Sequence, residues 1–113
     1  MPTTTNSVSL VVQRPGHAHY QYLVTGDVFR IGRSSTSDLL VPEPHVSNRH
    51  AEVRNQDGQY VLVDMESRAG VLVNGTPIKT HALQPDDVIE LGHASPIQIV
   101  FKQDATSKPS SVS

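Results

Sequence analysis

Six polar residues could together hold an anion. They fall in three short segments: FRIGRS at 29–34, VSNRHAEV at 46–53 and DMESRAGVLVNG at 64–75. The six residues are Arg33, Ser47, Asn48, Arg49, His50 and Arg68. Most of their side chains donate hydrogen bonds, and arginine binds phosphate oxygens through charge-assisted bonds. The set offers few groups for acid–base chemistry, so it favours an anion-binding site over an active site.

Each segment contributes at least one hydrogen-bond donor. Gly32 lets the chain turn sharply after the run VFRI, so Arg33 should project from the end of a strand. Ser47 can donate to a phosphate oxygen, Asn48 can pair with a peptide backbone, and Arg68 adds a second guanidinium. A phosphate on Ser or Thr carries a charge of about -1.5 to -2, and each charge-assisted bond contributes roughly 1.5–3 kcal/mol.

Three residues, His50 among them, are expected to hold these loops in place. His50 could brace the loop at 46–49 from beneath, which we consider a better reading than a catalytic role. Asp64 and Ser67 are expected to tie their own turn together, because Asp and Ser side chains readily bond to nearby backbone groups.

The elements that position these loops are predicted to be β-strands. Apolar residues alternate with period two in eight short runs, and no window has a helical period. The runs cover 8–13, 20–24, 28–31, 51–53, 60–63, 71–73, 88–91 and 97–101. Asp57-Gly58 and Asn74-Gly75 are typical of two-residue hairpin turns. The pattern predicts an all-β, two-sheet antiparallel sandwich.

The core is expected to be mainly aliphatic, because aromatic residues make up 4% of the chain and Trp is absent. Its bulkiest members are predicted to be Tyr20, Tyr22, Phe29, Tyr60 and Phe101. This leaves no aromatic platform on which nucleic-acid bases could stack. The net charge of -2 also lacks the basic excess of a nucleic-acid-binding protein.

The length of 113 residues fits one domain, which we place at 8–102. We expect residues 1–7 to be a disordered N-terminus and 103–113 to be a polar linker or tail. No stretch has the roughly 18 apolar residues that span a bilayer, and the chain has no cysteine. These features favour an intracellular protein without membrane association.

Metal binding is another possible use of the six histidines. His17 and His19 would share one strand face, but His45, His81 and His93 are scattered, and no convergent carboxylates accompany them. We therefore predict no metal site and no cofactor.

In order and spacing, FRIGRS, VSNRHAEV, DMESRAGVLVNG and the closing ALQPDDVIELG at 82–92 resemble a forkhead-associated (FHA) domain. The resemblance covers roughly residues 8 to 102. It implies a sandwich of about 11 strands that binds phosphothreonine peptides through the loops at one end. It also implies recruitment of a partner marked by an upstream Ser/Thr kinase.

The resemblance assigns a role to each site residue. Arg33 and Ser47 match the phosphate-binding positions, Asn48 matches a position that contacts the peptide backbone, and Arg68 matches one that touches the phosphate or the residues after it. The positions expected to shape the site are Gly32, Ser34, His50, Ser67, Ala69 and Gly70.

One departure from the family pattern affects the expected affinity. FHA domains commonly carry Asn-Gly-Thr where this chain has Ala69-Gly70-Val71, and that Asn usually bonds the peptide main chain. Losing one hydrogen bond costs about 0.5–1.5 kcal/mol, so binding should be several-fold weaker.

Two other functions remain open from the sequence. Ala69 could mark a domain that binds partners without phosphate. Ser47, His50 and Asp64 could form a hydrolase triad, although no Gly-x-Ser-x-Gly nucleophile elbow is present.

Overall fold

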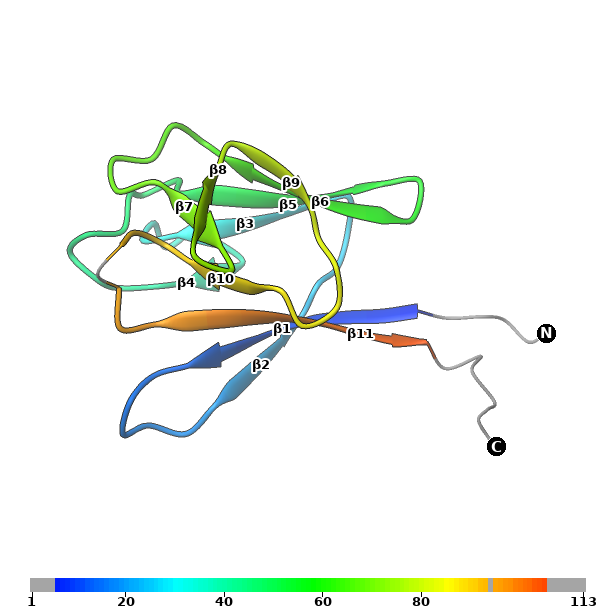
Figure 1. Ribbon diagram of the computed structural model, residues 1–113, viewed down its shortest axis with the longest axis horizontal. Coiled ribbons are helices and arrows are strands. Elements are labelled where there is room, and N and C mark those ends of the chain that lie inside the picture. Colours follow the sequence, from blue (N-terminus) through cyan, green and yellow to red (C-terminus); the bar gives the residue numbers. More distant parts are fainter. Residues whose placement is uncertain (1–5, 94, 106–113) are drawn as a thin grey trace.

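Eleven β-strands form two sheets in the computed structural model, which describes residues 6–93 and 95–105 (Figure 1). The predicted all-β sandwich is therefore confirmed. Among the described residues there is also no helix long and apolar enough to cross a membrane. The expected disordered start and polar tail fall mostly outside the described ranges, within which β1 begins at Asn6 and β11 ends at Ala105.

The first sheet has six strands and contains both ends of the described chain. In spatial order they are β2 (Tyr20–Leu23), β1 (Asn6–Gln13), β11 (Gln98–Ala105), β10 (Val88–Glu90), β7 (Val71–Val73) and β8 (Thr76–Ile78). β1 and β11 pair along their whole length, from Asn6 opposite Ala105 to Gln13 opposite Gln98. Pro77 lies in β8, at the sheet edge, where a residue without an N–H group is tolerated.

The second sheet has five strands and carries two of the three predicted anion-binding segments at its strand ends. Its order is β4 (Leu39–Leu40), β3 (Val28–Gly32), β5 (Ala51–Gln56), β6 (Gln59–Asp64) and β9 (Thr80–Ala82). β3 pairs with β4 in parallel, whereas the other pairs in this sheet are antiparallel. The predicted antiparallel arrangement therefore holds for the other pairs of this sheet, and the β3–β4 pair at its edge is the exception.

Two hairpins have the turns that their sequences predict. Asp57 and Gly58 join β5 to β6 with φ of 56° and 89°, and Asn74 and Gly75 join β7 to β8 with φ of 52° and 84°. Positive φ at both central residues is the requirement of a type I′ turn, which Asn, Asp and Gly tolerate best.

The core between the sheets is mainly aliphatic, as predicted, with Phe29 and Phe101 buried in it. Tyr22 and Tyr60 pack against it while partly exposed, and the Tyr60 and Phe101 rings lie 6.0 Å apart. The prediction for Tyr20 was wrong, because its side chain is 60% exposed. Tyr20 begins an edge strand, so it has neighbouring strands on one side only.

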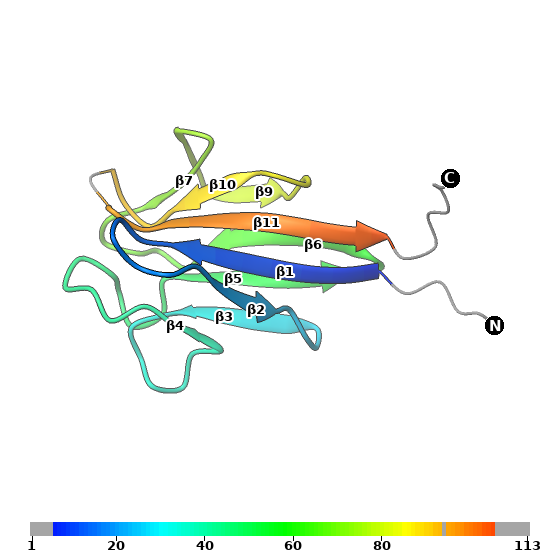
Figure 2. The same ribbon diagram turned by 90° about the horizontal axis from the view of Figure 1, so that it is seen from below.

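The loops that carry the predicted site gather at one end of the sandwich. Figures 1 and 2 show the loops after β3, before β5 and before β7 at the end opposite to the start of β1 and the end of β11. The two sheets thus present three separate segments of sequence at one surface.

Candidate anion-binding site

A pocket of about 200 Å³ lies among these loops. It is lined by all four residues predicted to bind a phosphopeptide: Arg33, Ser47, Asn48 and Arg68. Pro44, His45 and Val46 complete its lining and were missed by the sequence analysis. Their side-chain types gave no signal, because they line the pocket only through the path of the loop between β4 and β5.

Gly32 allows two of these loops to approach each other closely. A Cβ atom added at Gly32 would lie 2.1 Å from the backbone oxygen of Asn48, a distance that no side chain could occupy. Two backbone hydrogen bonds join the loops at this point, from Arg33 N to Ser47 O at 3.0 Å and from Ser34 N to Asn48 O at 3.2 Å. Arg33 is thereby held beside Ser47.

Ser47 is bonded to the other loops in a way that leaves its proton free. Its hydroxyl oxygen accepts a hydrogen bond from Arg68 N at 3.1 Å. A hydroxyl that accepts one bond can still donate its own hydrogen. Ser47 is only half-buried, so that O–H can be directed to a ligand oxygen in the pocket.

His50 is fully buried and links two of the loops. Its Nδ1 accepts a hydrogen bond from Ser47 N at 3.1 Å, and its Nε2 lies 2.7 Å from Gly70 O. An amide N–H can only donate, so Nδ1 carries no proton and Nε2–H donates to Gly70. Burial, as the largest influence, lowers the pKa of His50 below its ordinary value and favours this neutral form.

The same bonds argue against a hydrolase triad. Both ring nitrogens of His50 are engaged by backbone groups, so neither can accept a proton from the Ser47 hydroxyl. The Asp64 carboxylate does not bind His50. Its Oδ1 accepts hydrogen bonds from Ser67 N at 2.9 Å and from Ser67 Oγ at 2.7 Å. These three side chains therefore lack the relay that a triad requires.

The turn before β7 holds Arg68 at the rim of the pocket. Asp64 fixes Ser67, and Ser67 Oγ in turn accepts a hydrogen bond from Gly70 N at 3.1 Å. Gly70 has φ of 84°, in the left-handed region that glycine adopts without strain. The turn is thus tied at both ends, with Arg68 and Ala69 between its anchors.

Arg33 and Arg68 are both exposed, and neither forms an ion pair with any residue that the structure describes. Their guanidinium groups are consequently available to an anion from outside. No group of three or more potential metal ligands lies together within 6–93 and 95–105.

A measurable consequence follows from the neutral, buried His50. Above pH 6.5 both the folded and the unfolded chain keep His50 neutral, and its contribution to stability is full. As the pH falls below this value, the unfolded chain binds a proton that folded His50 resists, so stability should decline by up to about 1.4 kcal/mol per pH unit. The decline should continue until the pH reaches the lowered pKa of the folded state.

Urea unfolding between about pH 7.5 and about pH 5.5 would measure this loss. Nitrogen chemical shifts of the ring would report its protonation in the folded domain, where we expect neutral His50 with the proton on Nε2. A charged His50 ring at about pH 6 in a fully folded domain would contradict the assignment.

Comparison with known protein families agrees with this geometry. The family model for the FHA domain matches residues 29–92, a range that includes every residue of the pocket. The chain belongs to the FHA domain family. The expected family membership is therefore confirmed.

Relatives of this FHA domain include named regulatory proteins. It is 36% identical over 83 residues to an oxoglutarate dehydrogenase inhibitor of Corynebacterium diphtheriae, covering 74% of this chain and 58% of the relative. It is 34% identical over 86 residues to the glycogen accumulation regulator GarA of Mycolicibacterium smegmatis, covering 76% and 54% respectively. The chain thus spans a little over half the length of these two relatives.

Solved FHA domain structures have the same fold. The FhaA FHA domain, complexed with the intracellular domain of Rv3910, superposes with a TM-score of 0.73 at 31% identity, covering 85% of this chain and all of that one. EmbR of Mycobacterium tuberculosis, in complex with a low-affinity phosphopeptide, gives a TM-score of 0.76 at 25% identity over 88% of this chain and 25% of EmbR.

Proposed function

We propose that this FHA domain binds phosphothreonine peptides and thereby recruits a phosphorylated protein partner in signalling. The observation that carries the proposal is the convergence of Arg33, Ser47, Asn48 and Arg68 on one pocket at the loop end. Those residues come from three segments of the sequence, and the fold brings them together without engaging either guanidinium in an ion pair within the described chain.

The donors suit a phosphate monoester. Arg33 and Arg68 supply positive charge, and the free O–H of Ser47 supplies a further hydrogen bond to a phosphate oxygen. Asn48 is exposed at the same rim, where its amide can pair with the main chain of the peptide. A phosphate carrying a charge of about -1.5 to -2 would satisfy this set better than a singly charged carboxylate.

The module is proposed to act by binding and not by catalysis. The hydrogen bonds of His50 and Asp64 support a binding role, because both side chains bond to the loops that form the pocket. The names of the relatives, an inhibitor and a regulator, point in the same direction. A Ser/Thr kinase would phosphorylate the partner, so we propose that the domain binds its partner inside the cell. We expect micromolar affinity, which corresponds to a binding free energy of about -8 kcal/mol.

The test is binding to a degenerate phosphothreonine peptide library beside its unphosphorylated and phosphoserine counterparts. Saturable binding that requires the phosphate is expected, with weaker binding of phosphoserine because it lacks the methyl group, worth about 0.8 kcal/mol. Equal binding of phosphorylated and plain peptides would instead favour a phosphate-independent interaction surface.

Replacing Ala69 with Asn should strengthen phosphopeptide binding. Ala69 lies beside Arg68 in the anchored turn, at the position where FHA domains commonly present Asn to the peptide main chain. One added hydrogen bond of about 0.5–1.5 kcal/mol corresponds to about a two- to twelvefold lower Kd. Isothermal titration with one phosphothreonine peptide would measure the change, and Ala69→Ser serves as the shorter polar control. A Kd for Ala69→Asn no lower than that of the parent would contradict the expectation.

A further inference from the structure

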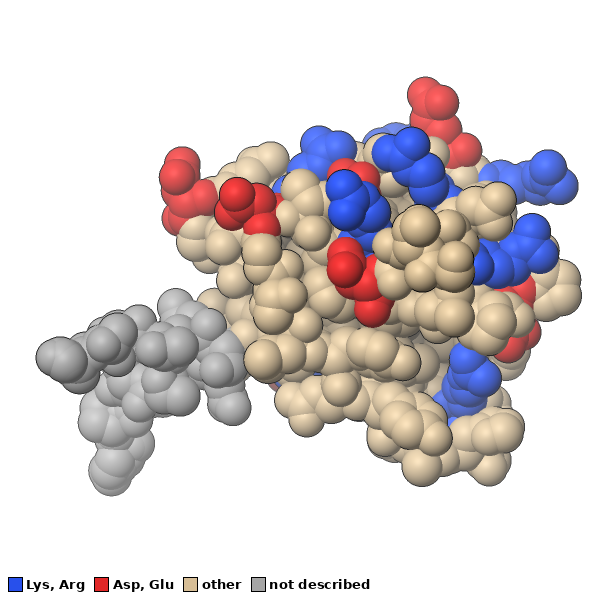
Figure 3. Space-filling model, turned by 180° about the vertical axis from the view of Figure 1, so that it is seen from behind, with Lys and Arg blue, Asp and Glu red and all other residues tan. Residues whose placement is uncertain are grey.

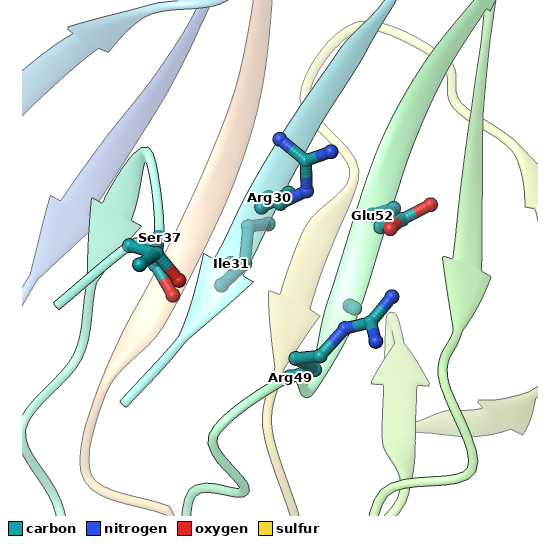
Figure 4. Close-up of a pocket in the computed structure, with 7 residues that line it drawn as sticks. Arg30, Ile31, Ser37, Arg49 and Glu52 are labelled. Atoms are coloured by element: carbon teal, nitrogen blue, oxygen red, sulfur yellow. The ribbon is translucent and has the colours of Figure 1, made fainter. Parts of the chain in front are cut away.

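A second pocket, of about 320 Å³, lies on the outer face of the five-stranded sheet. We call it the sheet-face pocket; it is lined by Arg30, Ile31, Thr36, Ser37, Arg49, Ala51 and Glu52. Figure 4 shows Arg30 on β3, with Glu52 on β5 and Arg49 just before β5 on one side of it, and Ser37 on the other. None of these residues lines the pocket at the loop end formed by Arg33, Ser47, Asn48 and Arg68, which we call the phosphate pocket.

The sheet-face pocket carries positive charge that the domain does not neutralise. Arg30 and Arg49 are exposed, and neither forms an ion pair with a residue inside the described ranges. The nearby Glu52 is already bound, because its Oε1 accepts from Arg54 Nε at 3.1 Å and from Arg54 Nη2 at 3.0 Å. The other nearby carboxylate, Asp38, accepts a hydrogen bond from the backbone N of Arg30 at 2.8 Å.

The face that carries this pocket is highly charged. In Figure 3 basic and acidic side chains are interspersed over the five-stranded sheet and its loop end. The part of the same view over β1 and β2 is mostly uncharged. Charged side chains of both signs are therefore concentrated on this face, and the positive charge of the sheet-face pocket comes from Arg30 and Arg49, which form no ion pair within the described residues.

The two pockets are neighbours through shared loops. Arg49 directly follows Asn48, which lines the phosphate pocket, and Ser34 N bonds to Asn48 O at 3.2 Å. The hydroxyls of Ser34 and Thr36 are 2.8 Å apart, which joins the start of this loop to the sheet-face pocket. From residue 33 to residue 36 the backbone can extend at most about 11 Å.

We propose that the sheet-face pocket binds acidic side chains of the same phosphorylated segment, two to four residues to one side of the phosphothreonine. An extended peptide rises about 3.3 Å per residue, so such residues lie about 7 to 13 Å from the phosphothreonine. Arg30 and Arg49 supply the charge, and the hydroxyls of Thr36 and Ser37 supply further donors. This inference rests on the proposed function and narrows its substrate to phosphothreonine segments with acidic residues on one side.

The experiment compares three phosphothreonine peptides at low salt. One is flanked by alanines, one has glutamates two to four residues before the phosphothreonine, and one has them two to four residues after it. Because the pocket lies to one side of the phosphate site, only one glutamate peptide should gain affinity, by about two- to tenfold for exposed charge pairs. Raising the salt concentration should remove the gain.

Paired variants separate this pocket from general charge effects. The gain should be lost in Arg30→Gln/Arg49→Gln and kept in Arg14→Gln/Lys102→Gln, which removes the same charge outside both pockets and serves as the matched control. Binding of the alanine peptide should change little in either. In addition, the favoured glutamate peptide should shift the backbone amide signals of Ser37 and Ala51 where the alanine peptide does not.

The outcomes distinguish this inference from the function on which it rests. Equal binding of all three peptides, an equal gain for both glutamate peptides, or a gain that survives Arg30→Gln/Arg49→Gln would overturn the inference alone. A domain that binds none of the phosphothreonine peptides would overturn the proposed function and the inference together.

Discussion

Replacing Arg33 with alanine should reduce phosphothreonine-peptide binding by about 30-fold or more while leaving the domain folded. Truncating one partner of a hydrogen-bonded charge pair costs about 2–5 kcal/mol, and about 2 kcal/mol already corresponds to a 30-fold loss. Arg33 is exposed and its side chain forms no ion pair within the described residues, so its removal takes nothing from the core. Isothermal titration with one phosphothreonine peptide would give the ratio of the two Kd values.

Arg14→Ala is the matched control for the Arg33 variant. Arg14 lies in the loop between β1 and β2, outside the phosphate pocket, and its loss changes the net charge equally. Binding of Arg14→Ala should stay within about twofold of the parent, as expected for a charge that lies outside the pocket. If Arg33→Ala bound the peptide as well as Arg14→Ala does, the phosphate would have to bind elsewhere.

Replacing Gly32 with alanine should destabilise the domain by about 3 kcal/mol or more, at or beyond the upper end of the usual cost of overpacking. The added Cβ would lie 2.1 Å from Asn48 O and 2.8 Å from Asn48 C, and these backbone atoms can give way only if the loop moves. Movement of that loop would strain the bonds from Arg33 N to Ser47 O and from Ser34 N to Asn48 O. Peptide binding should therefore be lost together with stability.

Gly26→Ala separates this close approach from an ordinary loss of glycine. Gly26 has φ of 76° and open space around its missing Cβ, so the variant should lose only the backbone term of about 1–2 kcal/mol. Urea unfolding of both variants would compare the free energies. A Gly32→Ala domain no less stable than Gly26→Ala would refute the contact between the two loops.

The alternation of apolar residues was enough to predict the sandwich and eight of its strands. β4, β8 and β9 were not predicted, because β4 has only two residues, and β8 (TPI) and β9 (THA) are too poor in apolar residues to show an apolar alternation. The parallel pairing of β3 with β4 was also beyond the sequence, since it depends on how the intervening loop returns. Tyr20 was misplaced because residue type does not reveal that its strand lies at a sheet edge.

The sequence was enough to select the hydrogen-bond donors of the site, but it could not reveal which groups surround each donor. Arg33, Ser47, Asn48 and Arg68 were chosen from the sequence, and the fold places them around one pocket, while their roles in binding remain predictions. The direction of the hydrogen bonds at His50 and the free proton of Ser47 required coordinates. Arg49 was counted among the anion-binding residues, but it lines the sheet-face pocket and not the pocket at the loop end. Arg30 gave no signal, because only the pairing of β3 with β5 brings it to the same pocket as Arg49.

The pairing of β1 with β11 has a consequence for how the domain is made. These strands are separated by almost the whole described chain, yet they lie side by side inside the six-stranded sheet. Until β11 is synthesised, β1 can pair only with β2, and β10 lacks one neighbour. Contacts between such distant residues must overcome a large loop-closure entropy, and proteins dominated by them fold in milliseconds to seconds. During translation, the sandwich cannot close before its final strand has left the ribosome.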